Sequence, residues 1–506
     1  MQRRNLLAAA LGGSTAMLSD IRGVPQTVPD GASLASPFSA ATVPDLARTL
    51  AQQPHRPRGT PLPREFQRLD YDAYRRIDYD RRHALWANSN LPFQIMPHHR
   101  GFLFPDRVEL FEVAEGQAAP LRYRPEHFNF GGLPVPERPE DIGFAGFRIL
   151  FPLNRADHFD ELCSFLGASY FRGLGRGHSY GLSARGLAIR TADPGGEEFP
   201  AFTAFWIERP AAGATAMRLH ALLESPSVTG AFSFVITPGE NTTMEVDATL
   251  FPRVDLPRIG IAPASSMFFF GPADREGVSD FRPSVHDSDG LMMITGRGEQ
   301  LWRVLANPRD LQVSGFQDHS PRGFGLVQRS RAFTDFQDLG ARYERRPSLW
   351  VEPLEEFGPG EVHLVEIPTQ SEIHDNIAAA WTPRQGLQAG SPRRIRYRLH
   401  WLSEPPGPPG LARFAMTRVT NGVRGARRRL FVLDTTRLPL GLNAQPRIST
   451  SAGEVQALWM QENIETGGLR INFELDPGRA SVAELRLRLM VGTTPIAEDW
   501  MFRWTG

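Results

Sequence analysis

The 506-residue chain contains no lysine, so all 56 of its basic residues are arginines. Schiff-base and pyridoxal-phosphate mechanisms need a lysine amine, and a Walker-type phosphate loop needs a lysine after its glycines. The sequence therefore excludes all three. Its single cysteine, Cys163, excludes both an internal disulfide and a structural metal site built on thiolates.

The chain also lacks an excess of charge and lacks long apolar runs. Its 56 basic residues balance 56 acidic ones, which argues against a nucleic-acid-binding protein held by bulk charge. No stretch is apolar for long enough to cross a bilayer as a mature helix. The glycine-rich stretch Gly173–Gly177 does not form a GxGxxG motif, so it gives little support to a nucleotide site. We expect no nucleic-acid partner, no membrane span in the mature chain, no metal and no cofactor.

A pair of arginines, Arg3 and Arg4, stands near the N-terminus before a short, mildly apolar run. This pattern predicts a twin-arginine export signal, and the run is too short to span a bilayer. Small residues at Ser39–Ala41 predict cleavage there, so that residues 1–41 form the signal peptide. Because this route exports folded proteins, we expect the mature chain in the periplasm.

Strand-like patterning dominates between about residues 105 and 370, where short apolar runs are broken by Gly, Pro, Asn and Asp. The run Met244–Phe251 alternates with period two and places Glu245 and Asp247 on one face. A short helix is expected at Leu69–Ile77, and no long amphipathic helix is found. The sequence predicts an all-β protein.

The chain is longer than one hydrophobic core usually serves, so two domains are expected. Residues 386–393 are rich in Gly, Ser, Pro and Gln, which predicts an exposed linker. Apolar residues then alternate with Arg and His over Arg394–Trp401, as in a half-buried strand. We predict a large β-sandwich over residues 42–385 and a smaller, immunoglobulin-like β-sandwich over residues 394–506.

Two loops carry the candidate chemistry. The first, Arg282–Gly290, contains His286 and Asp287 between a proline and a glycine, and the second, Pro368–Ile377, contains Asp375 directly after a histidine. Two such loops in a β-rich chain suggest a pair of acids that face one substrate. Ordinary turn chemistry explains the first loop equally well, and Asp375 is also suited to cap a short helix over the residues that follow it.

Several stretches together resemble one known family, the periplasmic glucan biosynthesis proteins G and D, which serve osmoregulated periplasmic glucans. These stretches span the predicted large domain and the end of the chain: Ala168–Arg172, Tyr180–Gly186, Val285–Gly290, Tyr343–Pro353, Asp375–Ile377 and Trp500–Trp504. The resemblance implies a large mutarotase-like β-sandwich with a glucan cleft, followed by the smaller immunoglobulin-like one. The arginine pair favours the D-type branch.

Members of this family resemble anomer-inverting endo-β-1,2-glucanases. The resemblance implies Asp375 as general acid and Asp287 as general base. One carboxyl group must hold a proton for the leaving oxygen, and the other must be ionised to activate water. We expect His286 and nearby arginines to keep Asp287 charged, and burial beside Trp350 or Glu372 to raise the pKa of Asp375.

Aromatic faces with adjacent acids suit sugar rings, which stack on one side and form hydrogen bonds through their hydroxyls. On this basis the expected substrate-binding residues are Tyr343, Trp350, Glu352, Glu372, Arg172 and His286. Trp350 is equally well explained as a core residue, and Arg172 and Arg185 as partners of structural carboxylates. Asp289 is better explained as closing its turn than as orienting His286.

The expected partner is therefore a β-1,2-linked glucan. Three functions remain open: an endo-acting hydrolase, a non-catalytic protein that binds and guides the glucan backbone, and a transglycosylase on the same site. The sequence does not separate hydrolysis from transfer, because the two differ only in the acceptor. It also leaves the oligomeric state open, with a homodimer among the states it allows.

Overall fold

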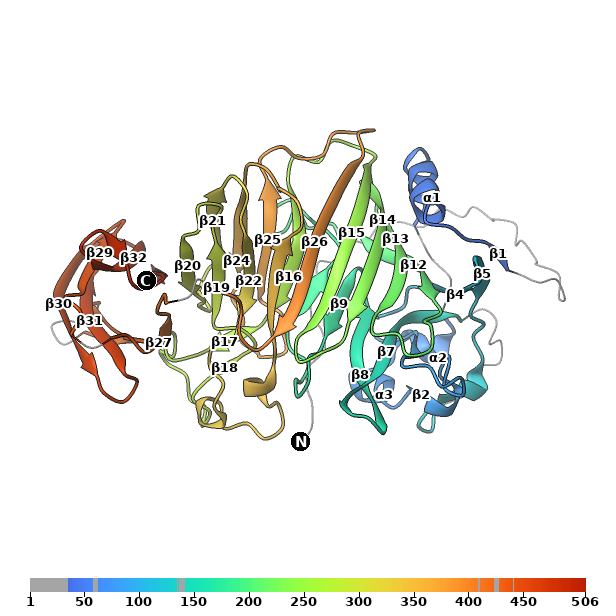
Figure 1. Ribbon diagram of the computed structural model, residues 1–506, viewed down its shortest axis with the longest axis horizontal. Helices are drawn as coiled ribbons and strands as arrows, with labels where there is room; N and C mark the ends of the chain where they lie inside the picture. The colour runs from blue at the N-terminus through green and yellow to red at the C-terminus, as the bar shows by residue number, and fades with distance from the viewer. Residues whose placement is uncertain are drawn as a thin grey trace.

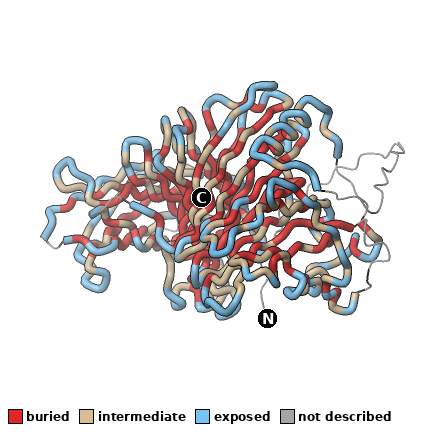
Figure 2. Tube along the Cα trace, turned by 45° about the vertical axis from the view of Figure 1, so that its right-hand side comes forward, coloured by how far each residue is buried: buried red, intermediate tan, exposed pale blue. Residues whose placement is uncertain are grey.

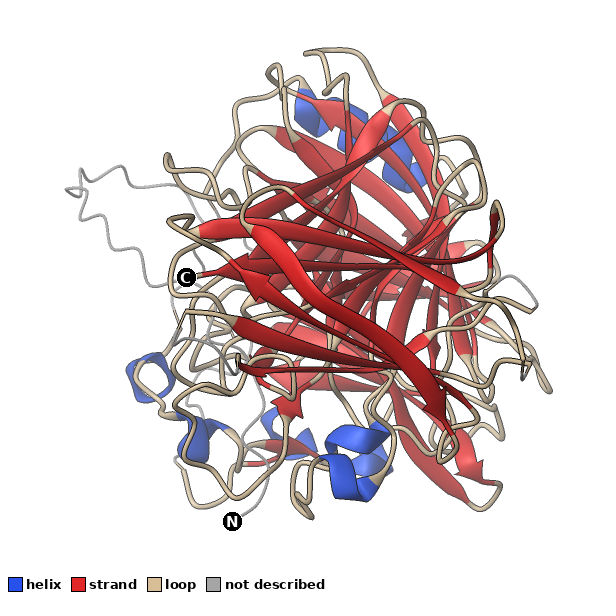
Figure 3. Ribbon diagram, turned by 90° about the vertical axis from the view of Figure 1, so that its left-hand side faces the viewer, coloured by secondary structure: helices blue, strands red, loops and turns tan. Residues whose placement is uncertain are grey.

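The computed structural model describes residues 35–57, 62–133, 135, 142–407, 410–422, 427–439 and 441–506. Strands are the dominant element of this part, and helices are short and peripheral (Figures 1 and 3). The helices are α1 (Thr42–Ala51), α2 (Arg64–Gln67) and α3 (Tyr71–Tyr74), with 3-10 turns at Arg81–His83, Pro125–His127, Phe333–Asp335 and Tyr343–Arg345. The all-β prediction is confirmed.

Two large sheets form the main body. The sixteen-stranded sheet has the order β1 (Ser36–Pro37), β5 (Gln117–Pro120), β4 (Glu109–Ala114), β12 (Ala201–Glu208), β13 (Met217–Glu224), β14 (Val228–Thr237), β15 (Thr242–Pro252), β26 (Arg393–Leu402), β23 (Ser348–Pro353), β22 (Gly323–Val327), β19 (Gly290–Ile294), β20 (Gln300–Val304), β34 (Asp499–Thr505), β32 (Val482–Val491) and β29 (Gln445–Thr450), with β33 (Thr494–Pro495) beside β32. The ten-stranded sheet has the order β21 (Gln312–Asp318), β24 (Gly360–Glu366), β25 (Ile377–Pro383), β16 (Ile259–Ser266), β10 (Ser183–Arg185), β9 (Tyr170–Gly173), β8 (His158–Leu166), β7 (Phe144–Arg155) and β3 (Gln94–His99), with β11 (Ala188–Ile189) beside β16.

The remaining strands form three smaller sheets. Four of them pair near the C-terminus in the order β27 (Phe414–Asn421), β28 (Arg429–Thr435), β31 (Gly468–Asp476) and β30 (Glu454–Asn463). Two-stranded pairs form between β17 (Phe268–Phe270) and β18 (Val285–His286), and between β2 (Asp78–Tyr79) and β6 (Phe128–Asn129).

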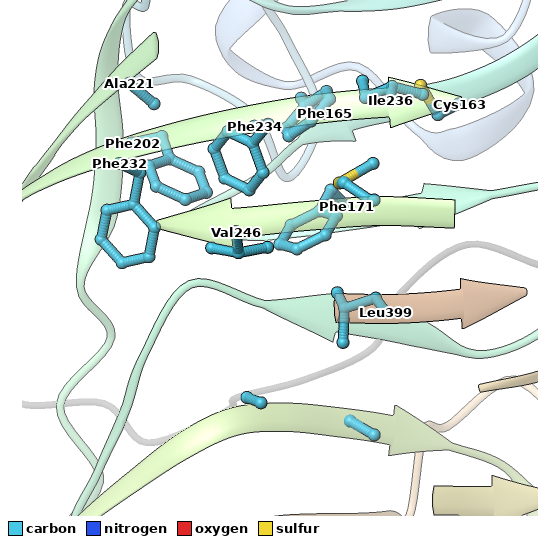
Figure 4. Packing of buried hydrophobic residues seen from close by; sticks show 14 of the residues in the cluster. Cys163, Phe165, Phe171, Phe202, Ala221, Phe232, Phe234, Ile236, Val246 and Leu399 are labelled. Atoms are coloured by element: carbon cyan, nitrogen blue, oxygen red, sulfur yellow. The ribbon is translucent and has the colours of Figure 1, made fainter. Parts of the chain in front are cut away.

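The core of the main body lies between the two large sheets and is rich in phenylalanine. Strand alternation turns Phe232 and Phe234 of β14 inward, where Phe165 and Phe171 of the opposite sheet each place a ring centroid 5.5 Å from that of Phe234 (Figure 4). Burial follows the strands, and exposed residues gather in the connecting loops (Figure 2). Cys163 is fully buried in this core, and burial raises the pKa of its thiol, so the cysteine is a packing residue.

A second core joins the C-terminal strands to the main body. Strand β34 runs parallel to β20 and pairs with it, so the sixteen-stranded sheet continues into the C-terminal region and faces the four-stranded sheet there. Trp500 packs between the two layers against Phe431 and Phe473, and the same apolar cluster includes Trp302 and Trp350 of the main body. The smaller sandwich therefore shares both a sheet and a core with the main body.

The predicted domain boundary at 386–393 is wrong. The strand expected to open the second domain is β26, and it lies inside the sixteen-stranded sheet between β15 and β23. The residues before it are anchored, because Leu387 is buried and exchanges two backbone hydrogen bonds with Leu256. Composition suggested a linker here, but non-local strand pairing, which composition does not reveal, decides the boundary.

Two expectations for the N-terminal region also need correction. The helix expected at Leu69–Ile77 forms only over the four residues of α3, which Asp70 caps. The arginine pair lies outside the described residues, but the predicted cleavage at Ser39–Ala41 lies inside them. There β1 pairs with β5 and the Phe38 ring stacks on Trp206, so cleavage at that point would remove folded structure. Within the described residues no helix is long and apolar enough to cross a membrane.

Candidate active site

The two acid-bearing loops meet at one short segment, Met267–Phe268, which continues β16 beyond the ten-stranded sheet. The backbone N–H of Asp287 donates to the Met267 carbonyl at 2.8 Å. The side-chain amide of Asn376 brackets Phe268, accepting from its N–H at 2.8 Å and donating to its carbonyl at 3.0 Å. Since Asp375 directly precedes Asn376, loops 88 positions apart in the sequence are fixed to adjacent residues.

This arrangement places the acids at one end of the sandwich. Asp375 lies just before β25 of the ten-stranded sheet, and Asp287 lies just before β19 of the sixteen-stranded sheet. The helix that was one alternative for the residues after Asp375 does not form, because those residues are strand β25, paired with β16 and β24. The site therefore lies where strands of both sheets begin, near the β17–β18 pair (Figure 1).

Asp287 has a charged partner. Its side chain is 5% exposed and forms an ion pair with Arg346, which is 2% exposed. Burial raises the pKa of Asp287, the charge of Asp375 adds to that rise, and Arg346 opposes it. The pKa of Arg346 is itself raised by the neighbouring carboxylate despite its burial, so the guanidinium stays charged and favours the ionised form of Asp287.

Asp375 is less well compensated. Its carboxyl oxygen Oδ2 is buried and has no hydrogen-bond partner among the described residues. The nearest cation, Arg172, is 3.7 Å away and donates its Nε–H to the Ser183 hydroxyl instead. Burial raises the pKa of Asp375, and Arg172 and then Arg346 oppose that rise. The two carboxyl groups thus differ in their ion pairs: Asp287 is hydrogen-bonded to Arg346, whereas Asp375 has only a longer contact with Arg172, at 3.7 Å, and accepts no hydrogen bond at Oδ2 among the described residues.

Tyr343 and Glu372 border this pair. The Arg346 guanidinium lies 4.2 Å from the Tyr343 ring centroid, and the buried Tyr343 hydroxyl has no hydrogen-bond partner in the described part of the chain. Glu372 pairs with Arg282 at 2.7 Å, and both Glu372 and Asp287 raise the pKa of Tyr343, whose largest shift comes from burial. Tyr343 thus lies beside the arginine that pairs with Asp287, and the substrate-binding role of Tyr343 and Glu372 stays a prediction.

His286 does not act as expected. Its ring stacks on Phe268 and meets Phe336 edge-on, and burial lowers its pKa, so the imidazole is neutral and Arg346 supplies the charge beside Asp287. Asp289 does not serve only its own turn, because its carboxylate accepts hydrogen bonds from the backbone N–H groups of Arg329 and Ser330 in a distant segment.

Two predicted substrate-binding residues lie elsewhere. Trp350 is 2% exposed and belongs to the second core, which matches its alternative role as a core residue. Glu352 accepts hydrogen bonds from Arg398 at 3.0 Å and His400 at 2.8 Å, within an ion-paired row across β23, β26 and β15. Nor does Trp350 bury Asp375, whose pKa shift has no contribution from Glu372 either.

A groove lies on the ten-stranded sheet, and Asp375 is not among its lining residues. It is lined by residues of β10, β16, β24 and β25 that include Arg185, Ser265, Glu361, His363 and Ala378. Arg185 pairs with Glu197 at 2.6 Å and lies over the Tyr170 ring, whose pKa the Asp375 charge helps to raise.

Sequence reasoning missed Arg346 and Asn376. Both lie inside stretches that the resemblance singled out, but Arg346 follows another arginine directly, and no local pattern distinguishes the one that pairs with Asp287. Asn376 is a residue type that is common in ordinary turns. The roles of Arg346 and Asn376 depend on contacts between segments that are far apart in the sequence.

Comparisons with known proteins agree with this geometry. The family model described as "Periplasmic glucan biosynthesis protein, MdoG" matches residues 38–504. "Glucans biosynthesis protein G" of Rhodopseudomonas palustris (strain BisA53) is 49% identical over 512 residues, covering 100% of both chains. The protein of the same name from Vibrio cholerae serotype O1 (strain M66-2) is 49% identical over 480 residues, covering 92% of this chain and 87% of its own.

A third relative with that name, from Bradyrhizobium diazoefficiens, is 46% identical over 511 residues and covers 100% of both chains. These relatives are named for the G protein, so they do not support the D-type assignment suggested by the arginine pair. Identity at this level over nearly the whole chain shows the family: the protein belongs to the periplasmic glucan biosynthesis protein family.

Proposed function

We propose that the protein is a periplasmic, anomer-inverting endo-β-1,2-glucanase that remodels the backbone of the periplasmic glucan. The observation that carries this proposal is the contrast between its two carboxyl groups. The Asp375 side chain is 13% exposed, its Oδ2 accepts no hydrogen bond among the described residues and lies 3.7 Å from Arg172, and burial raises its pKa, which favours a retained proton. Asp287 is ion-paired with a buried arginine, which favours a carboxylate. An acid and a base held in one site are what glycosidic-bond hydrolysis requires.

In this mechanism Asp375 donates its proton to the leaving glycosidic oxygen. Asp287 takes a proton from the attacking water, directly or through a sugar hydroxyl, on the opposite face of the sugar ring. Attack from that face inverts the anomeric configuration. Loss of its proton leaves Asp375 as an anion, and the nearby cations Arg172 and Arg346 stabilise that charge.

The endo mode of attack comes from the family resemblance, and the groove on the ten-stranded sheet is suited to hold part of a glucan chain. Its lining mixes alanine faces with Arg, Ser, Glu and His side chains. Such a lining suits sugar rings, which present apolar faces and hydroxyl edges. The linkage preference comes from the family resemblance rather than from any contact of this groove.

Product analysis tests the proposal. The mature protein is incubated with linear β-1,2-glucan, chain lengths are followed by chromatography, and the first-formed anomer is followed by NMR. We expect shortening to mid-sized oligosaccharides with inverted configuration. A retained configuration would rule out the inverting mechanism. Products longer than the substrate would favour transglycosylation, and binding without any turnover would favour a protein that only guides the glucan backbone.

A further inference from the structure

The loop that carries Asp287 rests on the segment 327–330, which follows β22. The backbone N–H of Asp289 donates to the Val327 carbonyl at 2.9 Å. The Gln328 amide donates to the His286 carbonyl at 3.0 Å. His286 directly before the proposed base and Asp289 two residues after it are therefore attached to this segment, so the position of the segment helps to set the position of Asp287.

The Asp289 carboxylate strengthens the attachment. It accepts a hydrogen bond from the Arg329 N–H at 3.0 Å, and Ser330 donates both its N–H at 3.1 Å and its hydroxyl at 3.2 Å. Hydrogen bonds to a carboxylate are stronger than those between neutral groups. Asp289 thus fixes the backbone of Arg329 and Ser330 to the base loop.

Arg329 then crosses to the C-terminal region. Its guanidinium forms a two-pronged ion pair with Glu498, with Nη2 and Oε2 2.8 Å apart, and lies 3.4 Å from the Trp302 ring centroid. The two charged side chains are 8% and 0% exposed. Planar, paired contacts of this kind define geometry as well as energy.

Glu498 is held in turn from two sides. It accepts the Phe414 N–H at 2.8 Å and the Gln300 amide at 2.6 Å. Beside these contacts Asp289 and Ser330 line one side of a small hollow, and the start of β27 lines the other. The polar contacts therefore link the base loop to the C-terminal region beside this hollow.

We propose that Glu498 is a positioning residue for the general base: the C-terminal region fixes Asp287 through Glu498, Arg329 and Asp289. This inference rests on the proposed function of Asp287. The contacts that attach the base loop do not depend on that function. It goes beyond the acid pair because it gives the smaller sandwich a role in the chemistry. Misplacement of a catalytic group by about 1 Å costs up to about 100-fold in rate.

The test compares Glu498→Gln with a matched control, Asp434→Asn. Asp434 is a buried carboxylate of the same region that pairs with Arg418 and Arg470, and it contacts no residue of the base loop among the described residues. We expect Glu498→Gln to lower kcat on linear β-1,2-glucan about tenfold or more with KM within about twofold. Hydrogen–deuterium exchange of the peptide spanning 286–290 should become faster. Asp434→Asn should change neither kcat nor that exchange rate.

A double variant examines whether the contacts act in series. If Glu498 works through Asp289, adding Asp289→Asn to Glu498→Gln should lower kcat no further than the more damaging single change. If the two substitutions instead lower kcat by independent factors that multiply in the double variant, the proposal would be overturned. If Glu498→Gln does not fold, Arg329→Lys takes its place, because it keeps the charge and loses the fork, with Arg418→Lys as its control.

The exchange measurement needs no turnover, so it separates two failures. A wild-type protein that cleaves no glucan would refute the proposed function, while faster exchange at 286–290 in Glu498→Gln alone would still support the attachment. Unchanged exchange would overturn the positioning role. Equal losses of kcat in Glu498→Gln and Asp434→Asn would also overturn it, because they would indicate general destabilisation. Faster exchange with an unchanged kcat in an active enzyme would overturn it as well.

Discussion

At the scale of single residues, the site depends on the different surroundings that the fold gives to two carboxyl groups of the same chemistry. Asp287 and Asp375 are both aspartates that directly follow a histidine, and their side chains are 5% and 13% exposed. What separates them is the position of Arg346, which pairs with one and only influences the other from a distance. A neutral His286 cannot take over that role.

The first prediction concerns these two acids. Asp375→Asn and Asp287→Asn should each lose about 10²–10⁴-fold in kcat while still binding glucan, because an amide keeps the shape but transfers no proton. Asp375→Asn should also raise Tm slightly at pH 7, since it removes a carboxyl group whose raised pKa makes ionisation costly in the folded state. Calorimetry and single-turnover kinetics measure the two effects. Full-rate cleavage by both variants would refute the site.

The second prediction concerns pH. Asp375 acts as an acid only while protonated, so the rate falls as pH rises through its pKa. Arg172 lowers that pKa, and Arg172→Gln should therefore raise it and move the alkaline limb of the kcat profile to higher pH. Arg185→Gln is the control, because Arg185 pairs with Glu197 and does not contribute to the pKa of Asp375. An alkaline limb that stays in place or moves to lower pH in Arg172→Gln would contradict the acid assignment.

At the scale of elements, the sequence predicted individual strands but not which strands pair with one another. The alternation of Met244–Phe251 and of Arg394–Trp401 predicted strands, and both form, as β15 and β26. The sequence did not show that β15 and β26 pair with each other, because the register between strands so far apart in the sequence depends on the whole sheet. The same holds for the site: the sequence indicated both acid loops, but not that Met267–Phe268 joins them.

The third prediction follows from that pairing. The stretch 384–392 should resist limited proteolysis, although its composition resembles a linker. Leu387 is 3% exposed, and the Gly390 N–H donates to the Pro252 carbonyl at 2.9 Å, so little of this backbone is free to enter a protease. Mass spectrometry of early fragments checks this. A first cut within 384–392 would show that the segment opens easily and would restore the linker interpretation.

At the scale of the whole molecule, export is the first property to test. Replacing Arg3 and Arg4 with lysine should keep the precursor in the cytoplasm, because the export receptor recognises the arginine pair. Fractionation followed by immunoblotting measures the distribution, with Arg56→Lys as a control outside the pair. Unchanged periplasmic delivery would refute a twin-arginine route. N-terminal sequencing of the exported protein should place cleavage before Ser36, since β1 and Phe38 belong to the folded body.

The last prediction concerns the unity of the two sandwiches. Composition suggested separable domains, but β34 extends the sheet of the main body through β20, and Trp302 and Trp350 share a core with Trp500. Removing residues 403–506 would expose that core and leave Arg329 without Glu498. Loss of one partner from a buried ion pair typically costs about 3–5 kcal/mol.

We therefore expect the full chain to unfold in a single calorimetric transition and the truncated chain to aggregate or lose near-UV circular dichroism. A truncated chain that keeps the Tm of the full protein would contradict this, as would two well-separated transitions in the intact one. The matched comparison is Trp500→Phe, which removes the hydrogen bond from the indole to Thr417 but keeps an aromatic ring in the shared core. That variant should lower the one transition temperature without splitting it, because both sandwiches depend on the same cluster.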